Sequence, residues 1–208
     1  VIPPFADQPA LAESVARFRG EAVALVIGVA DALAGADLSD FPVAWQERDA
    51  ALTVDAARQP DAALLHASRA DNLLIAGRVK SGDGADGLAT GEVQVSAAIE
   101  TAYVEHAPIE PEAGCAWMEG DVLVISACTQ APVMDQEDTA RVLGLPLARV
   151  RIIPAAAGGG FGTKLDVSLQ PLLGLAVLKT GQPCRMVYTR QESMISTTKR
   201  HPAAMRGQ

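Results

Sequence analysis

The sequence has few cysteines. Its 208 residues include only Cys115, Cys128 and Cys184, and no two of them form a C-x-x-C pair. This odd, scattered set argues against a disulfide-rich scaffold and cannot supply the four thiolates that an iron–sulfur cluster requires. We interpret all three as ordinary thiols of a reducing compartment, and we expect a cytoplasmic location.

Long apolar runs and clusters of basic residues are also missing. The longest apolar run, residues 22–30, ends at Asp31 and is too short to span a bilayer. The net charge is −8, and no basic stripe is present that could neutralise nucleic-acid phosphates. We therefore expect neither a membrane nor a nucleic-acid partner. The first residues have no initiator Met and no basic segment, so no signal peptide is visible and the natural start is expected upstream.

What the sequence does contain is a glycine-rich stretch, G-G-G-F-G-T-K at residues 158–164, directly after the strand-like run 150–154. Glycine lacks Cβ and adopts positive φ readily, so such a loop can approach a ligand closely and gather N–H groups into an anion-binding nest. The first hypothesis is therefore a phosphate-bearing or metal-bearing cofactor. A tight turn that binds nothing is the alternative.

The two commonest glycine-rich cofactor loops do not fit this stretch. A Walker A loop, G-x-x-x-x-G-K-[ST], would need glycine at Thr163 and serine or threonine at Leu165. The dinucleotide fingerprint G-x-G-x-x-G fits Gly158 and Gly160 but also meets Thr163, and no acidic residue stands about 20 positions further on.

Four ordered segments resemble the large subunit of the molybdenum hydroxylases, the family of xanthine dehydrogenase and aldehyde oxidoreductase. They are E-H-A-P-I-E-P-E-A at 105–113, T-Q-A-P at 129–132, the glycine loop at 158–164, and Y-T-R-Q-E-S-M at 188–194, which continues into T-K-R-H-P at 198–202. The family has H-x-x-[ML]-E-P, G-G-G-F-G-G-K and R-H-P in the same order. The run F-R-G-E-A-V-A at 18–24 is similar to a Y-x-G-E-x-V-A run in the family's first domain.

The resemblance implies an α+β fold in two parts. Residues 1–90 contain short alternating or apolar stretches between polar turns, which predict a small mixed α/β domain, similar to the family's hammerhead domain without its usual beginning. Residues 91–208 resemble the N-terminal part of the molybdenum-cofactor-binding domain. The polar stretch K-S-G-D-G-A-D-G at 80–87 predicts a loop or domain connection.

In the second part the pattern predicts strands from 91 to about 106, at 122–126 and at 150–154. It also predicts two helices. The first is capped by Asp135 and ends at Gly144, and the second is capped by Ser168 and ends at Gly181. The order strand, glycine loop, helix suits an anionic cofactor near a helix N-terminus.

The resemblance implies a molybdenum–pterin cofactor that hydroxylates an activated C–H bond with water as the oxygen source. Gln130 matches a glutamine that hydrogen-bonds the apical oxygen of molybdenum. Gly159, Gly160, Phe161 and Gly162 match the loop beside the metal, with the Gly162 N–H facing the metal's ligands and Phe161 as a pocket wall. No residue is expected to bind the metal directly. A turn-facing amide and a core aromatic are the alternatives for Gln130 and Phe161.

Three further polar residues belong to these segments. Pro108 and Pro111 forbid a regular helix around His106 and Glu110, so we interpret this pair as structural residues of a strand-to-loop corner and not as metal ligands. Lys164 is expected to anchor the loop, to contact carboxylates or to be solvated.

Two departures from the family limit what the resemblance implies. Leu165 stands where the purine-specific branch has a glutamate, which favours an aldehyde or another N-heteroaromatic as the small-molecule substrate. The family's general-base glutamate lies downstream of Gln208, so no catalytic residue is assigned within this chain. We expect the 208 residues to be a piece of the enzyme that is inactive alone. Its implied partners are the remainder of the large subunit and the domains or subunits that carry [2Fe-2S] and FAD.

Two other functions remain open. A non-catalytic assembly or structural module could keep the fold with an empty glycine loop, although packing alone would not require an amide at Gln130. An NAD-binding dehydrogenase is less favoured, because Thr163 would crowd the helix–strand approach that the third glycine of the fingerprint serves.

Overall fold

The computed structural model describes residues 7–208, the side chains of 85 and 86 aside. The chain forms two compact units. Unit 1 combines Val1–Leu33 with Ala102–Pro202, and unit 2 combines Ala34–Thr101 with Ala203–Gln208. The domain boundary proposed near residue 90 stays a prediction, and the first six residues of the first predicted domain lie outside the described part.

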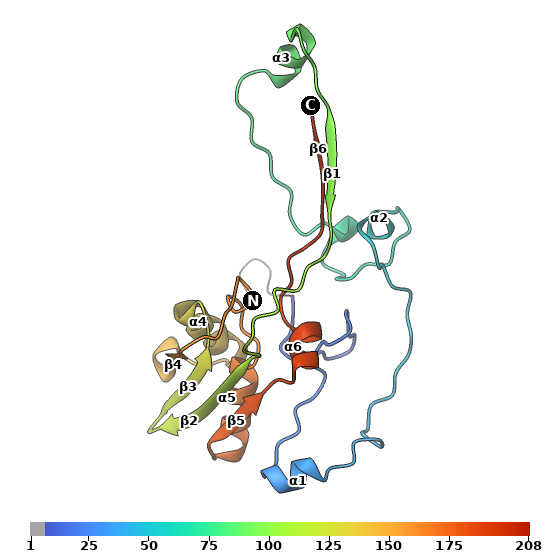
Figure 1. Ribbon diagram of the computed structural model, residues 1–208. Coiled ribbons are helices and arrows are strands. Elements are labelled where there is room, and N and C mark those ends of the chain that lie inside the picture. Colours follow the sequence, from blue (N-terminus) through green and yellow to red (C-terminus); the bar gives the residue numbers. More distant parts are fainter. Residues whose placement is uncertain (1–6) are drawn as a thin grey trace. The chain divides into compact units, whose positions relative to one another are not determined.

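Unit 1 contains a four-stranded sheet with the strand order β4-β3-β2-β5 (Figure 1). Strands β2 (Ala113–Glu119) and β3 (Val122–Cys128) form an antiparallel hairpin, and β5 (Cys184–Val187) pairs antiparallel with β2. Strand β4 (Val150–Ala155) runs parallel to β3. The predicted strands at 122–126 and 150–154 are therefore confirmed.

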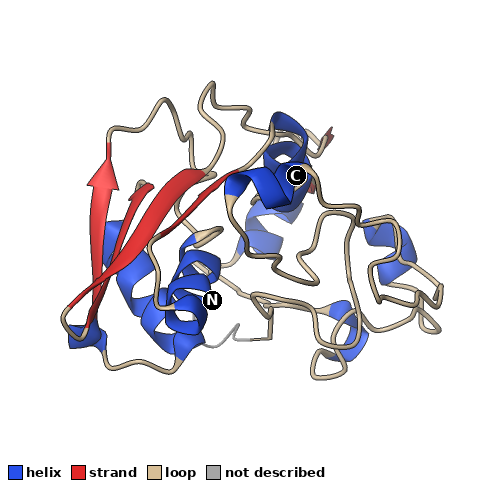
Figure 2. Ribbon diagram, turned by 90° about the horizontal axis from the view of Figure 1, so that it is seen from below, coloured by secondary structure: helices blue, strands red, loops and turns tan. Residues whose placement is uncertain are grey.

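Two helices of unit 1 pack against this sheet (Figure 2). Helix α4 (Pro132–Leu143) and the 3₁₀ turn η2 (Leu147–Arg149) connect the parallel strands β3 and β4, and α5 (Gln170–Thr180) leads from the glycine loop to β5. Parallel strands require such a crossover. Helix α5 contacts β2, β3 and β5, whereas α4 contacts β4 and α5.

The two helix ends confirm the sequence-based expectation, but the two starts correct it. Gly144 and Gly181 close the helices in the left-handed conformation, with φ of 66° and 67°. The proposed caps are wrong. A proline stands near each start, Pro132 and Pro171, and prolines suit the first helical positions because they lack an N–H. Ala131 and Leu169 are the N-cap residues, so neither Asp135 nor Ser168 caps a helix.

The core of unit 1 lies between the sheet and α5. Its fully buried members are Ala116, Leu123, Ile125, Ala127, Leu169, Leu173 and Val177. Gly174 allows α5 to approach closely, because a Cβ there would lie 2.6 Å from Cδ1 of Leu143 and 2.9 Å from Cδ2 of Leu123. Helix α6 (Arg190–Ser196) follows β5 and starts with a capping box formed by Thr189 and Glu192.

Unit 2 contains a two-stranded antiparallel ribbon of β1 (Ala97–Thr101) and β6 (Ala203–Gly207). The strand predicted from 91 to about 106 is therefore shorter than expected, because it begins only at Ala97 and ends at Thr101. Helix α1 (Ala30–Ala34) belongs to unit 1 except for its last residue. The remaining elements of unit 2 are short: α2 (Val54–Ala57), the 3₁₀ turn η1 (Ala70–Asn72) and α3 (Gly84–Thr90). Helix α3 occupies the second half of the loop predicted at 80–87, which corrects that prediction.

The α+β class is confirmed, because helices and both parallel and antiparallel strands occur in one chain. Within residues 7–96 the structure describes only short helical elements and no strand. Among the described helices, none combines the length and the apolar character needed to cross a membrane.

Candidate functional site

The glycine loop leaves β4 and forms a tight turn before α5. The N–H of Thr163 donates to the carbonyl of Gly160 at 2.9 Å, and the two residues between them, Phe161 and Gly162, have φ of 53° and 99°. A phenylalanine in the left-handed region is strained. Its side chain is 73% exposed, so Phe161 is not the core aromatic considered as an alternative.

Gln130 lies directly against this turn. Its Oε1 accepts hydrogen bonds from the N–H groups of Gly162 at 2.9 Å and Lys164 at 3.4 Å. Its own N–H donates to the carbonyl of Lys164 at 2.9 Å. Because both backbone donors engage Oε1, the amide nitrogen Nε2 remains a donor, and no group in residues 7–208 accepts a hydrogen bond from it.

These contacts change which backbone N–H groups of the loop are available. The N–H of Gly162, which the sequence-based interpretation directed at the metal's ligands, is engaged by Gln130 instead. No described group accepts a hydrogen bond from the N–H groups of Gly159, Gly160 or Phe161. The unpaired donors of the predicted nest are therefore these three and not Gly162.

Two glycines shape the space around the turn. A Cβ on Gly160 would lie 2.4 Å from Oε1 of Gln130, so only glycine lets the amide sit where it does. At Gly162, where φ is 99°, a Cβ would lie 3.7 Å from Nε2 of His106 and, apart from its chain neighbours, within 4 Å of no other described atom. Gly162 thus borders open space, which the imidazole of His106 limits on one side.

A buried ion pair fixes one side of the loop. Nζ of Lys164 lies 2.8 Å from Oε2 of Glu110 and 3.1 Å from the Glu110 carbonyl, and this lysine side chain is 1% exposed. The N–H of Gly158 also donates to Oε2 of Glu110, at 2.9 Å. Burial opposes ionisation of Glu110, but the hydrogen bonds from Lys164 and Gly158 outweigh it and lower the pKa of its carboxyl. Lys164 is an anchor, as expected, and is not solvated.

A second buried ion pair fixes the neighbouring segment. Nζ of Lys199 lies 2.6 Å from Oε2 of Glu105, and it donates to the carbonyl and the hydroxyl of Thr197, both at 2.7 Å. The hydroxyl of Thr163 donates to the carbonyl of Thr198 at 3.0 Å. The far end of the loop is therefore tied to residues 197–199. Sequence reasoning missed this pair, since neither charge stands at a recognisable spacing.

The link between β3 and α4 holds Gln130 in place. The hydroxyl of Thr129 accepts the N–H of Ala131 at 2.9 Å. Asp135, fully buried in α4, accepts a hydrogen bond from Nε2 of Gln170 at 2.9 Å, which joins α4 to the start of α5. Burial raises the pKa of Asp135. The amide thus projects from a short link between packed elements.

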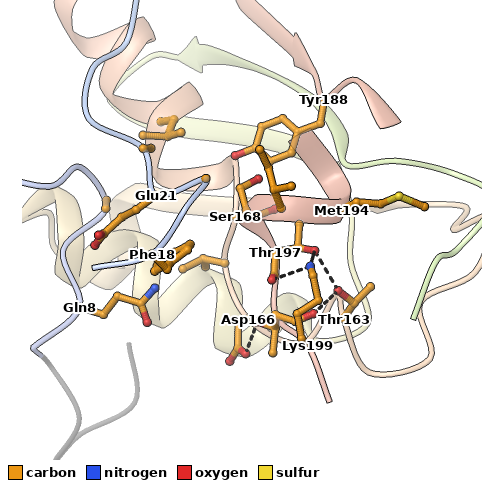
Figure 3. Close-up of a pocket in the computed structure, with 18 of the residues that line it drawn as sticks. Gln8, Phe18, Glu21, Thr163, Asp166, Ser168, Tyr188, Met194, Thr197 and Lys199 are labelled. Carbon is orange, nitrogen blue, oxygen red and sulfur yellow. Dashed lines mark hydrogen bonds between the residues drawn. The ribbon is translucent and has the colours of Figure 1, made fainter. Parts of the chain in front are cut away.

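A cavity of unit 1, about 670 Å³ in volume, lies elsewhere (Figure 3). Its lining includes Thr163, Ser168 and Tyr188, but neither Gln130 nor any of residues 159–162. Burial and the charges of Glu112 and Glu192 raise the pKa of Tyr188 to about 12. The cavity and the predicted cofactor loop are therefore two separate features that meet only at Thr163.

The structure brings together most of the sequence-predicted site residues. Gln130, Gly159, Gly160, Phe161, Gly162 and Lys164 form one continuous feature with His106 and Glu110. Leu165 follows the loop and is 42% exposed. Within residues 7–208, no group of three histidine, cysteine or acidic side chains could hold a metal ion.

Comparison with known proteins identifies a family. The model of the molybdopterin cofactor-binding domain matches residues 65–208. The nicotinate dehydrogenase large molybdopterin subunit of Eubacterium barkeri is 32% identical over 200 residues, which are 96% of this chain and 47% of that protein. The xanthine dehydrogenase molybdenum-binding subunit of Escherichia coli O157:H7 is 30% identical over 98% of this chain and 27% of its own length.

Solved structures show the same fold. Quinoline 2-oxidoreductase from Pseudomonas putida 86 superimposes with a TM-score of 0.77 and 27% identity, over 96% of this chain and 26% of that one. Aldehyde oxidoreductase from Desulfovibrio gigas gives a TM-score of 0.72 and 26% identity, over 77% and 18%. The chain thus spans about half or less of the length of each of these four proteins.

Proposed function

Because the chain belongs to the molybdopterin cofactor-binding domain family, we propose that it is part of a molybdenum-dependent hydroxylase whose cofactor binds at Gln130 and residues 159–162. The observation that carries this proposal is the orientation of the Gln130 amide. Two backbone N–H groups hold its oxygen, so its Nε2 is left as a fixed, uncharged donor. Such a donor suits an oxygen ligand of a metal, because it adds no charge.

The residues present fit the cofactor. The unpaired N–H groups of Gly159, Gly160 and Phe161 suit the anionic oxygens of a pterin phosphate or of the metal's ligands. Gly162 leaves the space beside them open. When bound, the molybdenum–pterin group supplies oxygen transfer from water and takes up two electrons. The chain's part is to hold and polarise it, while the exposed ring of Phe161 forms a wall.

We propose that the general base comes from another part of the protein. A carboxylate base must be free to take a proton. Near the loop, however, Glu110 and Glu105 are each paired with a buried lysine, Lys164 and Lys199. Both are therefore structural, which agrees with the interpretation of Glu110 from the sequence. The 208 residues alone are expected to be inactive for this reason.

For the substrate, we propose an N-heteroaromatic compound or an aldehyde. Leu165 places an exposed apolar side chain where a purine-specific site would have a carboxylate. The relatives named for nicotinate, quinoline and aldehydes support this range. The proposed partners are the remainder of the large subunit and the domains or subunits that carry [2Fe-2S] and FAD, because the electrons must leave the molybdenum.

The test is the molybdenum content of the complete protein, isolated with its subunits from its natural host. We expect stoichiometric metal per polypeptide. Gln130→Leu should reduce the kcat for an aldehyde or N-heteroaromatic substrate by roughly 10²-fold, as the loss of one preorganised donor does elsewhere. Gln182→Leu, at an exposed position between α5 and β5, is the matched control and should leave the kcat unchanged. A folded protein without molybdenum would instead support the non-catalytic module.

A further inference from the structure

His106 occupies a turn whose backbone is strained. Ala107, the next residue, has a φ of 45°, which is rare for a residue with a side chain. The carboxylate of Glu105 stabilises this turn, because its Oε1 accepts the N–H of Ala107 at 3.1 Å. Its Oε2 lies 2.6 Å from the buried Lys199. Strain that is held in place by a buried ion pair marks a position whose geometry matters.

The segment is fixed at its other end as well. Pro108 is fully buried, and Glu110 binds both Nζ of Lys164 and the N–H of Gly158. The N–H of Glu110 also donates to the carbonyl of Gly158, at 3.3 Å. Residues 105–110 therefore cannot move independently of the glycine loop, and the imidazole has a defined place beside it.

The imidazole faces the open space at Gly162. Its Nε2 lies 3.7 Å from where a Cβ of Gly162 would be, and no other atom of residues 7–208 comes within 4 Å of that point, the chain neighbours of Gly162 aside. Its Nδ1 is buried, with no hydrogen-bond partner among the described groups. Because a buried N–H without an acceptor is rarer than an acceptor without a donor, we assign the proton to Nε2. The ring then directs an N–H toward the space at Gly162.

From this geometry we infer that His106 is a further site residue, which donates a hydrogen bond from Nε2 to an acceptor bound next to Gly162. The inference rests on the proposed function, and it replaces the purely structural role predicted for His106 from the sequence. The acceptor is an oxygen or nitrogen atom, either on a ligand of the cofactor's metal or on the substrate. Nε2 of His106 and Nε2 of Gln130 would then bind from different segments.

The experiment compares His106→Leu with His106→Gln in the complete protein. Glutamine places an N–H near the position of Nε2, whereas leucine keeps the volume without a donor. Three quantities are measured: molybdenum per polypeptide, the X-ray absorption spectrum of the molybdenum centre, and kcat and KM. His201→Leu is the control, since His201 is exposed and its ring lies 6.5 Å, between centroids, from the Tyr103 ring.

The source of the acceptor decides which quantity changes. If it belongs to the cofactor, His106→Leu lowers the molybdenum content or alters the spectrum. If it belongs to the substrate, content and spectrum stay unchanged and kcat/KM falls by about tenfold or more, as for other lost donors to a reacting group. In both cases His106→Gln retains most of the wild-type behaviour, and His201→Leu retains all of it.

Two results would overturn the inference. One is a His106→Leu protein that equals the wild type in all three measurements. The other is a folded His106→Gln protein that is as impaired as His106→Leu, because the donor would then be irrelevant. If the leucine variant does not fold, His106→Asn replaces it, since its amide reaches only the Nδ1 position and should fail where glutamine succeeds. A wild-type protein without molybdenum would overturn the proposed function itself, which is a distinct outcome.

Discussion

Two stretches of this chain are rich in glycine, yet their surroundings differ completely. At Gly77, Gly82, Gly84 and Gly87 an added Cβ would meet no atom within 4 Å. In the loop after β4, a Cβ at Gly158 would lie 2.7 Å from Cβ of Glu110, and one at Gly160 would lie 2.4 Å from Oε1 of Gln130. The glycines of the first stretch border open space. Those of the second stretch allow the side chains of Glu110 and Gln130 to lie directly against the backbone of the loop.

This difference shows what makes a glycine loop a candidate site. Both stretches are polar or glycine-rich in sequence, and both could be interpreted as loops. Only the second is surrounded by fixed polar groups, namely the amide of Gln130 and the ion pair of Glu110 with Lys164. Glycine content is therefore a weak indication of a binding site. The polar side chains that contact the glycines are the stronger indication.

The largest expected effect comes from Gly160→Ala. The new methyl group would collide with the Gln130 amide and displace it without removing it. If the amide holds the cofactor, molybdenum per polypeptide or kcat should fall to a small fraction of the wild type, although alanine is otherwise a mild change. Elemental analysis and turnover of the complete protein measure this. Gly77→Ala is the matched control and should change neither, and equal values for both variants would contradict the role of Gln130.

Much of this arrangement was predictable from the sequence. The strands around 122–128 and 150–155 follow from apolar runs, and Gly144 and Gly181 end the two helices as expected. The neighbourhood of Gln130 and residues 159–162 followed from the resemblance to a family. These features depend on local pattern or on motifs that the family shares.

The remaining features depend on contacts between distant residues. The N–H of Gly162 pairs with Gln130, which is 32 positions away, so the loop's free donors could not be inferred from the loop alone. Lys199 and Glu105 are far apart in the chain, and no spacing rule connects them. The helix starts were missed because Pro132 and Pro171 outweigh the capping preference of nearby polar residues.

The next largest effect is expected from removing the charge of the buried Lys164, compared with the exposed Lys80. Lys164→Met should leave the carboxylate of Glu110, which is 29% exposed, without its partner, and it should destabilise the loop by less than the roughly 3–5 kcal/mol lost when a fully buried pair is broken. Hydrogen–deuterium exchange of peptides that cover 105–112 and 156–170 measures this locally in the complete protein. Lys80→Met, in the exposed glycine stretch, is the control. Unchanged exchange in Lys164→Met would mean that the pair does not hold the loop.

The smallest expected effect concerns pH and the same carboxylate. The pKa of Glu110 is lower in the folded chain than its ordinary value of 4.5, because the hydrogen bonds from Lys164 and Gly158 favour the ionised form. Its contribution to stability is therefore complete above pH 4.5 and is lost as the pH falls through the lower folded value. After correction for the intrinsic pH dependence of amide exchange, the protection factors of the 156–170 peptides in the wild type should fall over this acid range. Glu110→Gln should already have lower protection factors at neutral pH, and these should fall less on acidification. Glu47→Gln, at an exposed position, should follow the wild type. If Glu110→Gln shows the full acid response, another group governs the loop, and the contrast between the two glycine stretches would then rest on the amide of Gln130 alone.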